Sequence, residues 1–184
     1  MEWVHVELVS KGDMECMEWL SSQAPEGCFV EVGVYQGGTA KVLYRVCEQQ
    51  GRKLYLYDTF KGIPYKDPID PHVVGDFSYT DPEYISKMLP KALVREGIFP
   101  ASAVEMPPIA FVHLDVDQYR SYKESIEYLK PRMVPGGIMW FDDYGCVPGA
   151  TAAVDELIGK ENLTWCGNQT TSDNQVIGKA FTRF

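Results

Sequence analysis

The stretch CFVEVGVYQGGTA, residues 28–40, runs from an apolar, β-rich segment into a glycine turn and then into the start of a helix. This order of strand, turn and helix is typical of open α/β sheets, which bind their ligands where the strands end. Gly33 permits a tight turn, while Gly37 and Gly38 let a ligand approach the backbone closely. A helix capped by Thr39 then presents unpaired N–H groups to an anion. The stretch therefore predicts an α/β fold with a ligand site at its first turn between a strand and a helix.

Strands and helices are expected to alternate along most of the chain. Strands are predicted at residues 28–34, 53–58, 92–96, 108–116, 136–144, 163–168 and 175–184, and helices at 14–24, 39–51, 81–89, 121–133 and 149–160. The apolar runs are continuous rather than alternating, as in parallel strands that helices cover on both faces. No helix separates the last two strands, so they should form an antiparallel hairpin at one edge. We predict a single domain, residues 1–184, with a Rossmann-like, doubly wound, mainly parallel seven-stranded sheet and a C-terminal antiparallel hairpin.

The first predicted helix is amphipathic. It should bury a face made by Met14, Met17 and Leu20. Trp3 and Trp19 lie in the same region, and we expect this face to belong to the core. A contact with a second copy in a homodimer is the alternative.

Composition narrows the classes of partner and compartment. The 17 basic residues are outnumbered by 26 acidic ones, which gives a net charge of −9 and argues against nucleic acid or an anionic membrane as a partner. No apolar run approaches the ~20 residues of a membrane span, and the N-terminus does not resemble a signal peptide. The five cysteines form no C-x-x-C pair, so we expect reduced thiols in a cytoplasmic protein. They are Cys16, Cys28, Cys47, Cys146 and Cys166.

Two acidic residues accompany the glycine turn. Glu31 stands two positions before Gly33, and Asp58 ends the next predicted strand. The dinucleotide-binding pattern G-x-G-x-x-G is absent, which argues against a nicotinamide cofactor. An acid placed like Glu31 suits the amino group of S-adenosylmethionine, and Asp58 can accept hydrogen bonds from ribose hydroxyls. An ordinary turn without a ligand is the alternative.

Paired carboxylates follow two further apolar runs. Asp115 and Asp117 follow the first run, and Asp142 and Asp143 follow the second. A right-handed crossover would bring both strand ends to one edge of the sheet. The first pair shares a side if its strand persists to Asp117, and the second converges if the chain turns just after Phe141. Clustered carboxylates repel one another unless a cation joins them, and oxygen ligands select a hard ion such as Mg²⁺, Mn²⁺ or Ca²⁺. Surface acids that cap helices are the alternative.

Other polar and aromatic side chains near these motifs have two interpretations each. His113 is expected to be a hydrogen-bonded histidine inside its strand, with a metal contact as the alternative. His72, in the long loop 59–80, is either solvated or a base or substrate contact. Aromatic residues in the motif loops either pack locally or stack on a ligand ring. These are Tyr35, Phe60, Tyr65, Tyr79, Tyr119 and Tyr144.

Four segments together resemble the macrocin O-methyltransferase-like family. They are FVEVGVYQGGTA (29–40), LYLYDTFKGIP (54–64), FVHLDVDQYRSY (111–122) and LKPRMVPGGIMWFDDYG (129–145). The resemblance spans about residues 28–146 and is most specific at D-x-D-x-Y and F-D-D-Y-G. Members of this family are class I S-adenosylmethionine-dependent enzymes that methylate sugar hydroxyls with a magnesium-type ion. The resemblance therefore implies methyl transfer to a hydroxyl of a small-molecule acceptor, a glycoside or another diol.

The resemblance also implies roles for individual residues. Asp115, Asp142 and Asp143 would hold the metal ion, while Asp117 would act as the general base beside Asp115. The expected cofactor contacts are Glu31, Gly33, Val34, Gly37, Thr39, Asp58, Thr59, Phe60 and Asp115. Family members that act on large glycosides carry a longer segment before the glycine motif. We therefore expect a different acceptor, a more open site, or cover supplied by a second subunit.

Two other functions fit part of the pattern. A metal-dependent glycosyltransferase also uses a D-x-D motif, to hold a nucleotide sugar through its metal. The turn at Glu31 and Gly33 followed by Asp58 does not call for that chemistry, and no basic residue near the turn suits a diphosphate. A non-catalytic domain that binds S-adenosylmethionine is the third hypothesis, and the intact acids after both strands argue against it.

Overall fold

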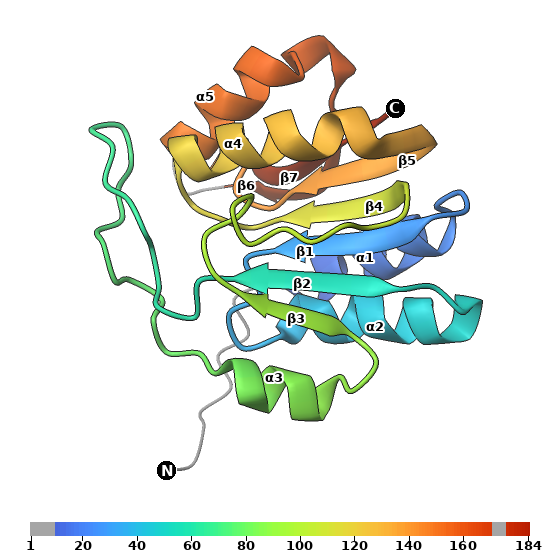
Figure 1. Ribbon diagram of the computed structural model, residues 1–184. Helices are drawn as coiled ribbons and strands as arrows, with labels where there is room; N and C mark the ends of the chain where they lie inside the picture. The colour runs from blue at the N-terminus through green and yellow to red at the C-terminus, as the bar shows by residue number, and fades with distance from the viewer. Residues whose placement is uncertain (1–9, 171–175) are drawn as a thin grey trace.

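The chain forms a single twisted sheet with helices on both of its faces (Figure 1). The computed structural model describes residues 10–170 and 176–184. The strands are β1 (Cys28–Val32), β2 (Leu54–Asp58), β3 (Leu93–Glu96), β4 (Ile109–Leu114), β5 (Met133–Phe141), β6 (Thr164–Thr170) and β7 (Val176–Arg183). The helices are α1 (Lys11–Ser22), α2 (Gly38–Gln50), α3 (Pro82–Met88), α4 (Tyr119–Leu129) and α5 (Pro148–Leu157), with 3-10 turns at Lys130–Arg132 and Lys160–Asn162.

The order of the strands creates a binding edge. It is β3-β2-β1-β4-β5-β7-β6, with β1 to β5 parallel and β7 antiparallel to both β5 and β6. From β1 the chain winds outward to β3 and then returns to β4, so the strand order reverses between β1 and β4. The carboxyl ends of these strands point to the same edge, where ligands bind in such sheets. The predicted doubly wound sheet and its C-terminal hairpin are confirmed.

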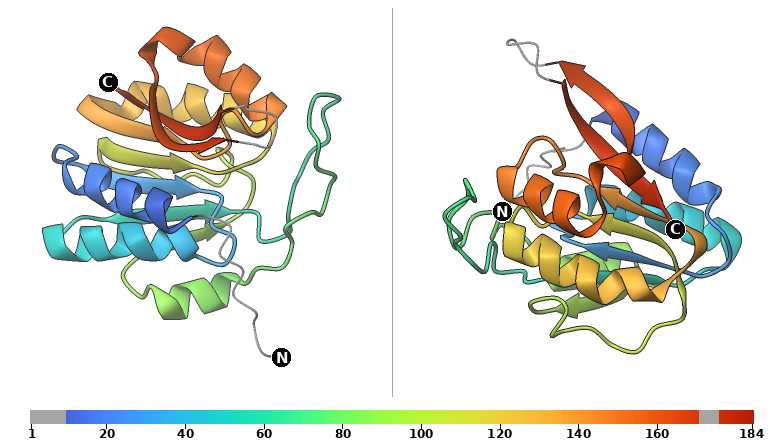
Figure 2. Two further views of the ribbon diagram at one scale, coloured as in Figure 1. Left: turned by 180° about the vertical axis from the view of Figure 1, so that it is seen from behind. Right: turned by 90° about the horizontal axis from the view of Figure 1, so that it is seen from above.

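The core lies in two layers, one on each face of the sheet. Helices α1 and α2 cover one face and α4 and α5 cover the other (Figure 2). Along β4, Phe111 packs in the layer of α1 and α2, while Val112 packs in the layer of α4 and α5. All six residues of β4 are buried. Burial on both faces explains why these strands are apolar at every position in the sequence.

The start of α2 and the end of α4 differ from the prediction, and the backbone conformations of a glycine and a proline explain the differences. Helix α2 is capped by Gly37 and not by Thr39, because Gly37 adopts a left-handed conformation with φ +80°. A Cβ at Gly37 would also lie 2.6 Å from the Cε atom of Met88. Helix α4 ends at Leu129, because Pro131 cannot continue it, and β5 already begins at Met133.

The N-terminal helix buries only part of the predicted face. Met17 and Leu20 are buried, but Trp19 is 62% exposed, so the expectation that Trp19 belongs to the core is wrong. Trp19 follows Met17 by two positions, and a helix turns by too much over two residues for both to share one face. Trp3 lies outside the described residues.

A disulfide contradicts the prediction that all cysteines are reduced. Cys16 in α1 and Cys166 in β6 are bonded although 150 positions separate them. The sequence does not reveal this pairing, because only the packing of α1 beside the edge strand β6 brings the two together. Cys28, Cys47 and Cys146 are free thiols.

Membrane-spanning helices are missing from residues 10–170 and 176–184. None of the helices there has both the length and the apolar composition needed to cross a bilayer.

The long loop 59–80 extends from the carboxyl edge of the sheet (Figure 1). The middle of this loop is fastened to the start of α4, where Asp70 Oδ1 accepts a hydrogen bond from the Tyr119 amide at 3.0 Å. The side chain of Gln118 donates to the Tyr65 carbonyl, and the Arg120 guanidinium lies 4.0 Å from the centre of the Tyr65 ring. These contacts hold the loop beside the strand ends.

The disulfide predicts a measurable thiol count and a stability difference. Thiol titration of the unfolded, non-reduced chain should find the three free cysteines. Cys16→Ser should add the thiol of Cys166 and lower the free energy of unfolding by about 2–4 kcal/mol, because the unfolded chain loses its cross-link. Cys146→Ser, which removes an exposed free thiol, is the control and should leave stability unchanged. Five reactive thiols in the non-reduced chain would contradict the bond.

Candidate functional site

Four carboxylates meet where β4 and β5 end. Strand β4 ends at Leu114, so the strand does not persist to Asp117 as the sequence analysis required. Asp117 instead turns back through a left-handed conformation with φ +56°, and its amide donates to Asp143 Oδ2 at 3.0 Å. Carboxylate oxygens of Asp115, Asp117 and Asp143 lie within 4.8 Å of one another. A backbone turn, and not an extended strand, therefore brings the first pair to the site.

The second pair converges as predicted, because the chain turns directly after Phe141. The Asp142 amide donates to the Leu114 carbonyl at 2.9 Å, which ties the end of β5 to the end of β4. Asp142 and Asp143 are each 8% exposed, yet both line the same cavity as Asp115. The two pairs thus form one cluster in a mostly buried cleft.

The glycine turn lies against this cluster. Gly33 has φ +88°, and a Cβ built on it would lie 1.7 Å from the carbonyl oxygen of Asp115. No larger residue fits there without moving the backbone of one strand end or the other. The absent side chain at Gly33 therefore lets the turn after β1 and the acids after β4 share a single site.

Asp58 shapes the turn as well as lining the cleft. Its Oδ2 accepts hydrogen bonds from the amides of Val34 and Tyr35, at 2.8 and 2.9 Å. Its Oδ1 accepts from the Phe60 amide at 2.7 Å. These bonds fix the loops after β1 and β2 around one carboxylate, which faces the cleft.

The cleft has an apolar end and an acidic end. The apolar cavity, of about 80 Å³, includes Val32, Ile63, Ile98 and Phe99 in its lining. The acidic cavity, of about 170 Å³, is lined by Tyr35, Phe77, Asp142 and Asp143 among others. The two are adjacent, because Gly33, Asp58, Asp115 and Asp117 line both of them. At the apolar end, the buried Ser125 hydroxyl has no hydrogen-bond partner among the described residues.

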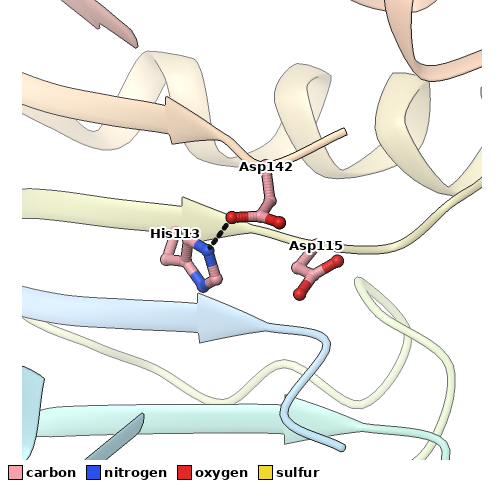
Figure 3. A group of neighbouring side chains, drawn as sticks. All are labelled: His113, Asp115 and Asp142. Atoms are coloured by element: carbon pink, nitrogen blue, oxygen red, sulfur yellow. Dashed lines mark hydrogen bonds and ion pairs between the residues drawn. The ribbon is translucent and has the colours of Figure 1, made fainter. Parts of the chain in front are cut away.

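A buried chain of hydrogen bonds connects the two motifs. His113 Nδ1 lies 2.8 Å from Glu31 Oε1. Figure 3 shows the second contact, in which His113 Nε2 lies 3.2 Å from Asp142 Oδ1. The Thr39 hydroxyl also donates to Glu31. His113 is therefore the hydrogen-bonded strand residue that we predicted. Glu31 is fully buried and lines neither cavity, so its expected contact with a cofactor amino group stays a prediction.

Lys179 is the site residue that the sequence analysis missed. Its ammonium forms an ion pair with Asp142 Oδ2, and its side chain is 15% exposed. Burial opposes the charged form, but the carboxylates of Asp142 and Asp115 nevertheless raise the pKa of Lys179. A single lysine in the last strand belongs to no recognisable sequence motif. Only the pairing of β7 with β5 brings Lys179 to the site.

Nearby cationic groups stabilise the negative charge of Asp142 more than that of the other carboxylates in the cluster. Burial and the neighbouring carboxylates raise the pKa of Asp117 to about 8 and that of Asp143 to about 6. The same causes raise the pKa of Asp115 well above its usual value. Burial acts on Asp142 as well, but His113 and Lys179 lower its pKa to about 2. Burial disfavours the charge on His113, yet its bonds to Asp142 and Glu31 raise its pKa to about 10.

His72 faces the cluster from the long loop. Its Nε2 lies 3.6 Å from Asp117 Oδ1, and its Nδ1 lies 3.8 Å from Asp76 Oδ2. The ring also packs edge-on against Phe77, with 5.0 Å between centroids. The structure thus favours a site contact over a solvated loop histidine.

Most of the aromatic candidates pack locally. Tyr35 lines the acidic cavity edge-on to Phe77, with 6.2 Å between their centroids. The Tyr119 hydroxyl donates to Glu156, and Tyr144 packs against Trp165. Phe60 is buried, Tyr65 lies under Arg120, and Tyr79 is half exposed.

Some of the residues expected to contact the cofactor line the cleft, and others do not. Gly33, Asp58, Thr59 and Asp115 line the apolar cavity. Glu31, Val34, Gly37, Thr39 and Phe60 line neither cavity. Except for Phe60, which follows β2, the residues of this second group belong to β1, the glycine turn or the start of α2.

A family model described as a methyltransferase domain matches residues 30–144. The chain is 26% identical over 170 residues to the 8-demethyl-8-(2,3-dimethoxy-alpha-L-rhamnosyl)-tetracenomycin-C 4'-O-methyltransferase of Streptomyces olivaceus, covering 81% of this chain and 64% of that protein. It is also 26% identical over 173 residues to the mycinamicin III 3''-O-methyltransferase of Micromonospora griseorubida, covering 81% of this chain and 67% of that protein. The chain thus spans roughly two thirds of the length of the curated relatives it matches.

Solved structures share the fold. The calicheamicin methyltransferase CalS11 superposes with a TM-score of 0.74 at 18% identity, covering 94% of this chain and 77% of that one. The O-methyltransferase NovP gives a TM-score of 0.73 at 19% identity, with 94% and 79% coverage. Both matches extend over nearly the whole of this chain.

The raised carboxylate pKa values predict a pH dependence of stability. Between the usual carboxylate pKa near 4 and the folded values, the folded state binds more protons than the unfolded state. Stability in chelator should therefore fall as pH rises from about 4 to about 8. Asp117→Asn should flatten this slope in thermal unfolding followed across that range. Stability that rises through the same window would contradict the assignment.

Proposed function

The chain belongs to the methyltransferase domain family that its residues 30–144 match, and on this premise we propose that it transfers a methyl group from S-adenosylmethionine to a sugar hydroxyl. The family match and the relatives that are named O-methyltransferases together support the resemblance to class I S-adenosylmethionine-dependent O-methyltransferases. The observation that carries the proposal is that the turn at Gly33 packs directly against the backbone of Asp115 and lines the same cavity as the acidic cluster. The cytoplasmic location and the homodimer expected from the sequence stay predictions.

The acceptor class is inferred from the relatives. Two of them are named as methyltransferases of a rhamnosyl-tetracenomycin and of mycinamicin III. A glycoside or another small molecule with neighbouring hydroxyls is therefore the acceptor that we propose here. The mouth of the acidic cavity, lined by Tyr35 and Phe77, is the part of the cleft that such a molecule would reach.

The cleft suits the methyl donor. Its apolar end, with Ile63, Ile98 and Phe99, matches a flat aromatic base, and the orphan Ser125 hydroxyl offers that base a polar contact. Asp58 stands at the junction of the two cavities, where it can accept hydrogen bonds from ribose hydroxyls. The acidic end favours a cationic sulfonium, because its carboxylates are only partly compensated.

The donor set also suits a hard divalent cation. Oxygens of Asp115, Asp117 and Asp143 lie within 4.8 Å of one another, and burial leaves their charge costly without a counter-ion. The resemblance assigns the ion to Asp115, Asp142 and Asp143, with Mg²⁺ as the expected metal. A bound cation of this kind polarises a coordinated hydroxyl and lowers its pKa.

The residues of the chain then act on the acceptor. Asp115 and Asp143 hold its hydroxyl near the methyl donor, which supplies the proximity that a displacement needs. Asp117 takes the hydroxyl proton while the oxygen forms a bond to the methyl carbon and the carbon–sulfur electron pair passes to sulfur. Asp117 is the candidate for this base, because its carboxylate lines the same cavity as Asp115 and Asp143.

Glycosyl transfer and non-catalytic binding of S-adenosylmethionine have less support than methyl transfer. The family match favours methyl transfer over transfer of a sugar from a nucleotide sugar. A non-catalytic domain would not need four carboxylates held at one strand edge, because their repulsion costs stability.

Methyl transfer is tested directly with purified protein. Incubation with S-adenosylmethionine, Mg²⁺ and rhamnosyl glycosides should release S-adenosylhomocysteine and give a product heavier by one methylene. Chelator should abolish turnover and added Mg²⁺ should restore it. Turnover that is unaffected by chelator would refute the metal's role, and glycosyl transfer from a nucleotide sugar would refute methyl transfer.

The role of Asp117 predicts a specific kinetic defect. Asp117→Asn should lower kcat by about 10²–10⁴-fold, the usual effect of losing a general base, while the Kd for S-adenosylhomocysteine stays near the wild-type value. Glu96→Gln, an exposed carboxylate paired with Lys61, is the control and should leave kcat unchanged. If His72→Ala shows the loss and Asp117→Asn does not, His72 is the base instead.

A further inference from the structure

Asp142 differs from the other three carboxylates because cationic groups hold both of its oxygens. Oδ1 lies 3.2 Å from His113 Nε2, and Oδ2 pairs with the ammonium of Lys179. Within the described residues, Asp115 and Asp143 have no ion pair with a lysine or an arginine. The cluster therefore contains one carboxylate that the protein itself neutralises beside others that it does not.

The position of Lys179 follows from the sheet register. In the antiparallel pair of β5 and β7, Phe141 stands opposite Ala180. Continuing this register by one residue places Lys179 opposite Asp142, where the side chains of antiparallel neighbours meet. On its other side, Lys179 is opposite Cys166 of β6. The ammonium is thus held by the fold on a paired strand and does not depend on a loose surface side chain.

Lys179 is also mostly withdrawn from solvent, because its side chain is 15% exposed and that of Asp142 is 9% exposed. Water therefore screens this pair less than it screens the surface pairs, such as Lys123 with Glu156, whose side chains are 33% and 45% exposed. A charge held here acts strongly on anything bound at the neighbouring carboxylates.

We propose that Lys179 is a built-in counter-cation that neutralises Asp142 in the absence of a divalent ion and weakens the affinity of the cluster for that ion. The proposal rests on the divalent-cation site of the proposed function. A divalent ion at Asp115 and Asp143 would be repelled by an ammonium on the adjacent Asp142. It would also compete with Lys179 for the oxygens of that residue. Lys179 thereby stabilises the folded cleft when no metal ion is bound. The same ammonium lowers the affinity of the cleft for a metal ion.

The test is the affinity for Mn²⁺ alone, measured by calorimetry or by electron paramagnetic resonance without methyl donor or acceptor. Lys179→Met should bind Mn²⁺ about tenfold more tightly or better, because a unit charge a few ångströms from a divalent ion is poorly screened there. Lys179→Gln, which removes the charge but keeps a polar end, should shift the affinity in the same direction if Lys179→Met does not fold. Lys179→Arg keeps the charge and should retain the wild-type affinity. Lys123→Met removes a surface lysine and is the control, with no expected change.

Thermal unfolding supplies a second measurement. In chelator, Lys179→Met should unfold at a lower temperature than wild type, because Asp142 loses its partner. Mn²⁺ should then raise its unfolding temperature by more than it raises that of wild type, since tighter binding stabilises the folded state more.

The outcomes separate this inference from the proposed function. Tighter Mn²⁺ binding by Lys179→Met supports the inference, even if wild type binds too weakly to detect and the proposed metal dependence fails. Equal or weaker binding overturns the inference while leaving methyl transfer intact. Absence of Mn²⁺ binding in both proteins overturns the inference and the metal role together.

Discussion

The mutual repulsion of four carboxylates at the ends of β4 and β5 is the constraint on which the site depends. Asp115, Asp117, Asp142 and Asp143 converge in a cleft that excludes much of the water that would otherwise screen them. A cluster of this kind persists only if cations, hydrogen bonds or protons offset the repulsion. The fold supplies His113 and Lys179 to one carboxylate and leaves the rest with raised pKa values. The remaining negative charge favours cations in the cleft.

The sheet brings the apolar end and the acidic end of the cleft together. The strand order reverses between β1 and β4, so the turn after β1 faces the acids after β4. Gly33 makes the contact possible, because any side chain there would occupy the space of the Asp115 carbonyl. Asp58 then holds the neighbouring loops with three backbone amides. One glycine and one carboxylate thus align two parts of a site that lie far apart in the chain.

A chain of mostly buried hydrogen bonds and ion pairs leads to the acidic end of the cleft. It runs from Glu31 below the glycine turn, through His113 in β4, to Asp142 and Lys179. Each charged member of this chain has an oppositely charged partner, although Glu31 Oε2 is buried without a hydrogen-bond partner among the described residues. It links β1, which leads into the glycine turn, to β4 and to the first of the carboxylates that follow β5.

The sequence by itself determined the doubly wound sheet and the positions of the carboxylates, because both depend on local patterns: apolar runs, glycine turns and acids at strand ends. The tertiary structure alone decided how the acids are compensated. Lys179 reaches Asp142 through the register of β7 on β5, and Cys16 meets Cys166 because α1 packs beside β6. Long-range pairings of this kind leave no periodicity or spacing in a sequence. The backbone turn at Asp117 was equally hidden, because a left-handed residue other than glycine follows from its contacts and not from its own preference.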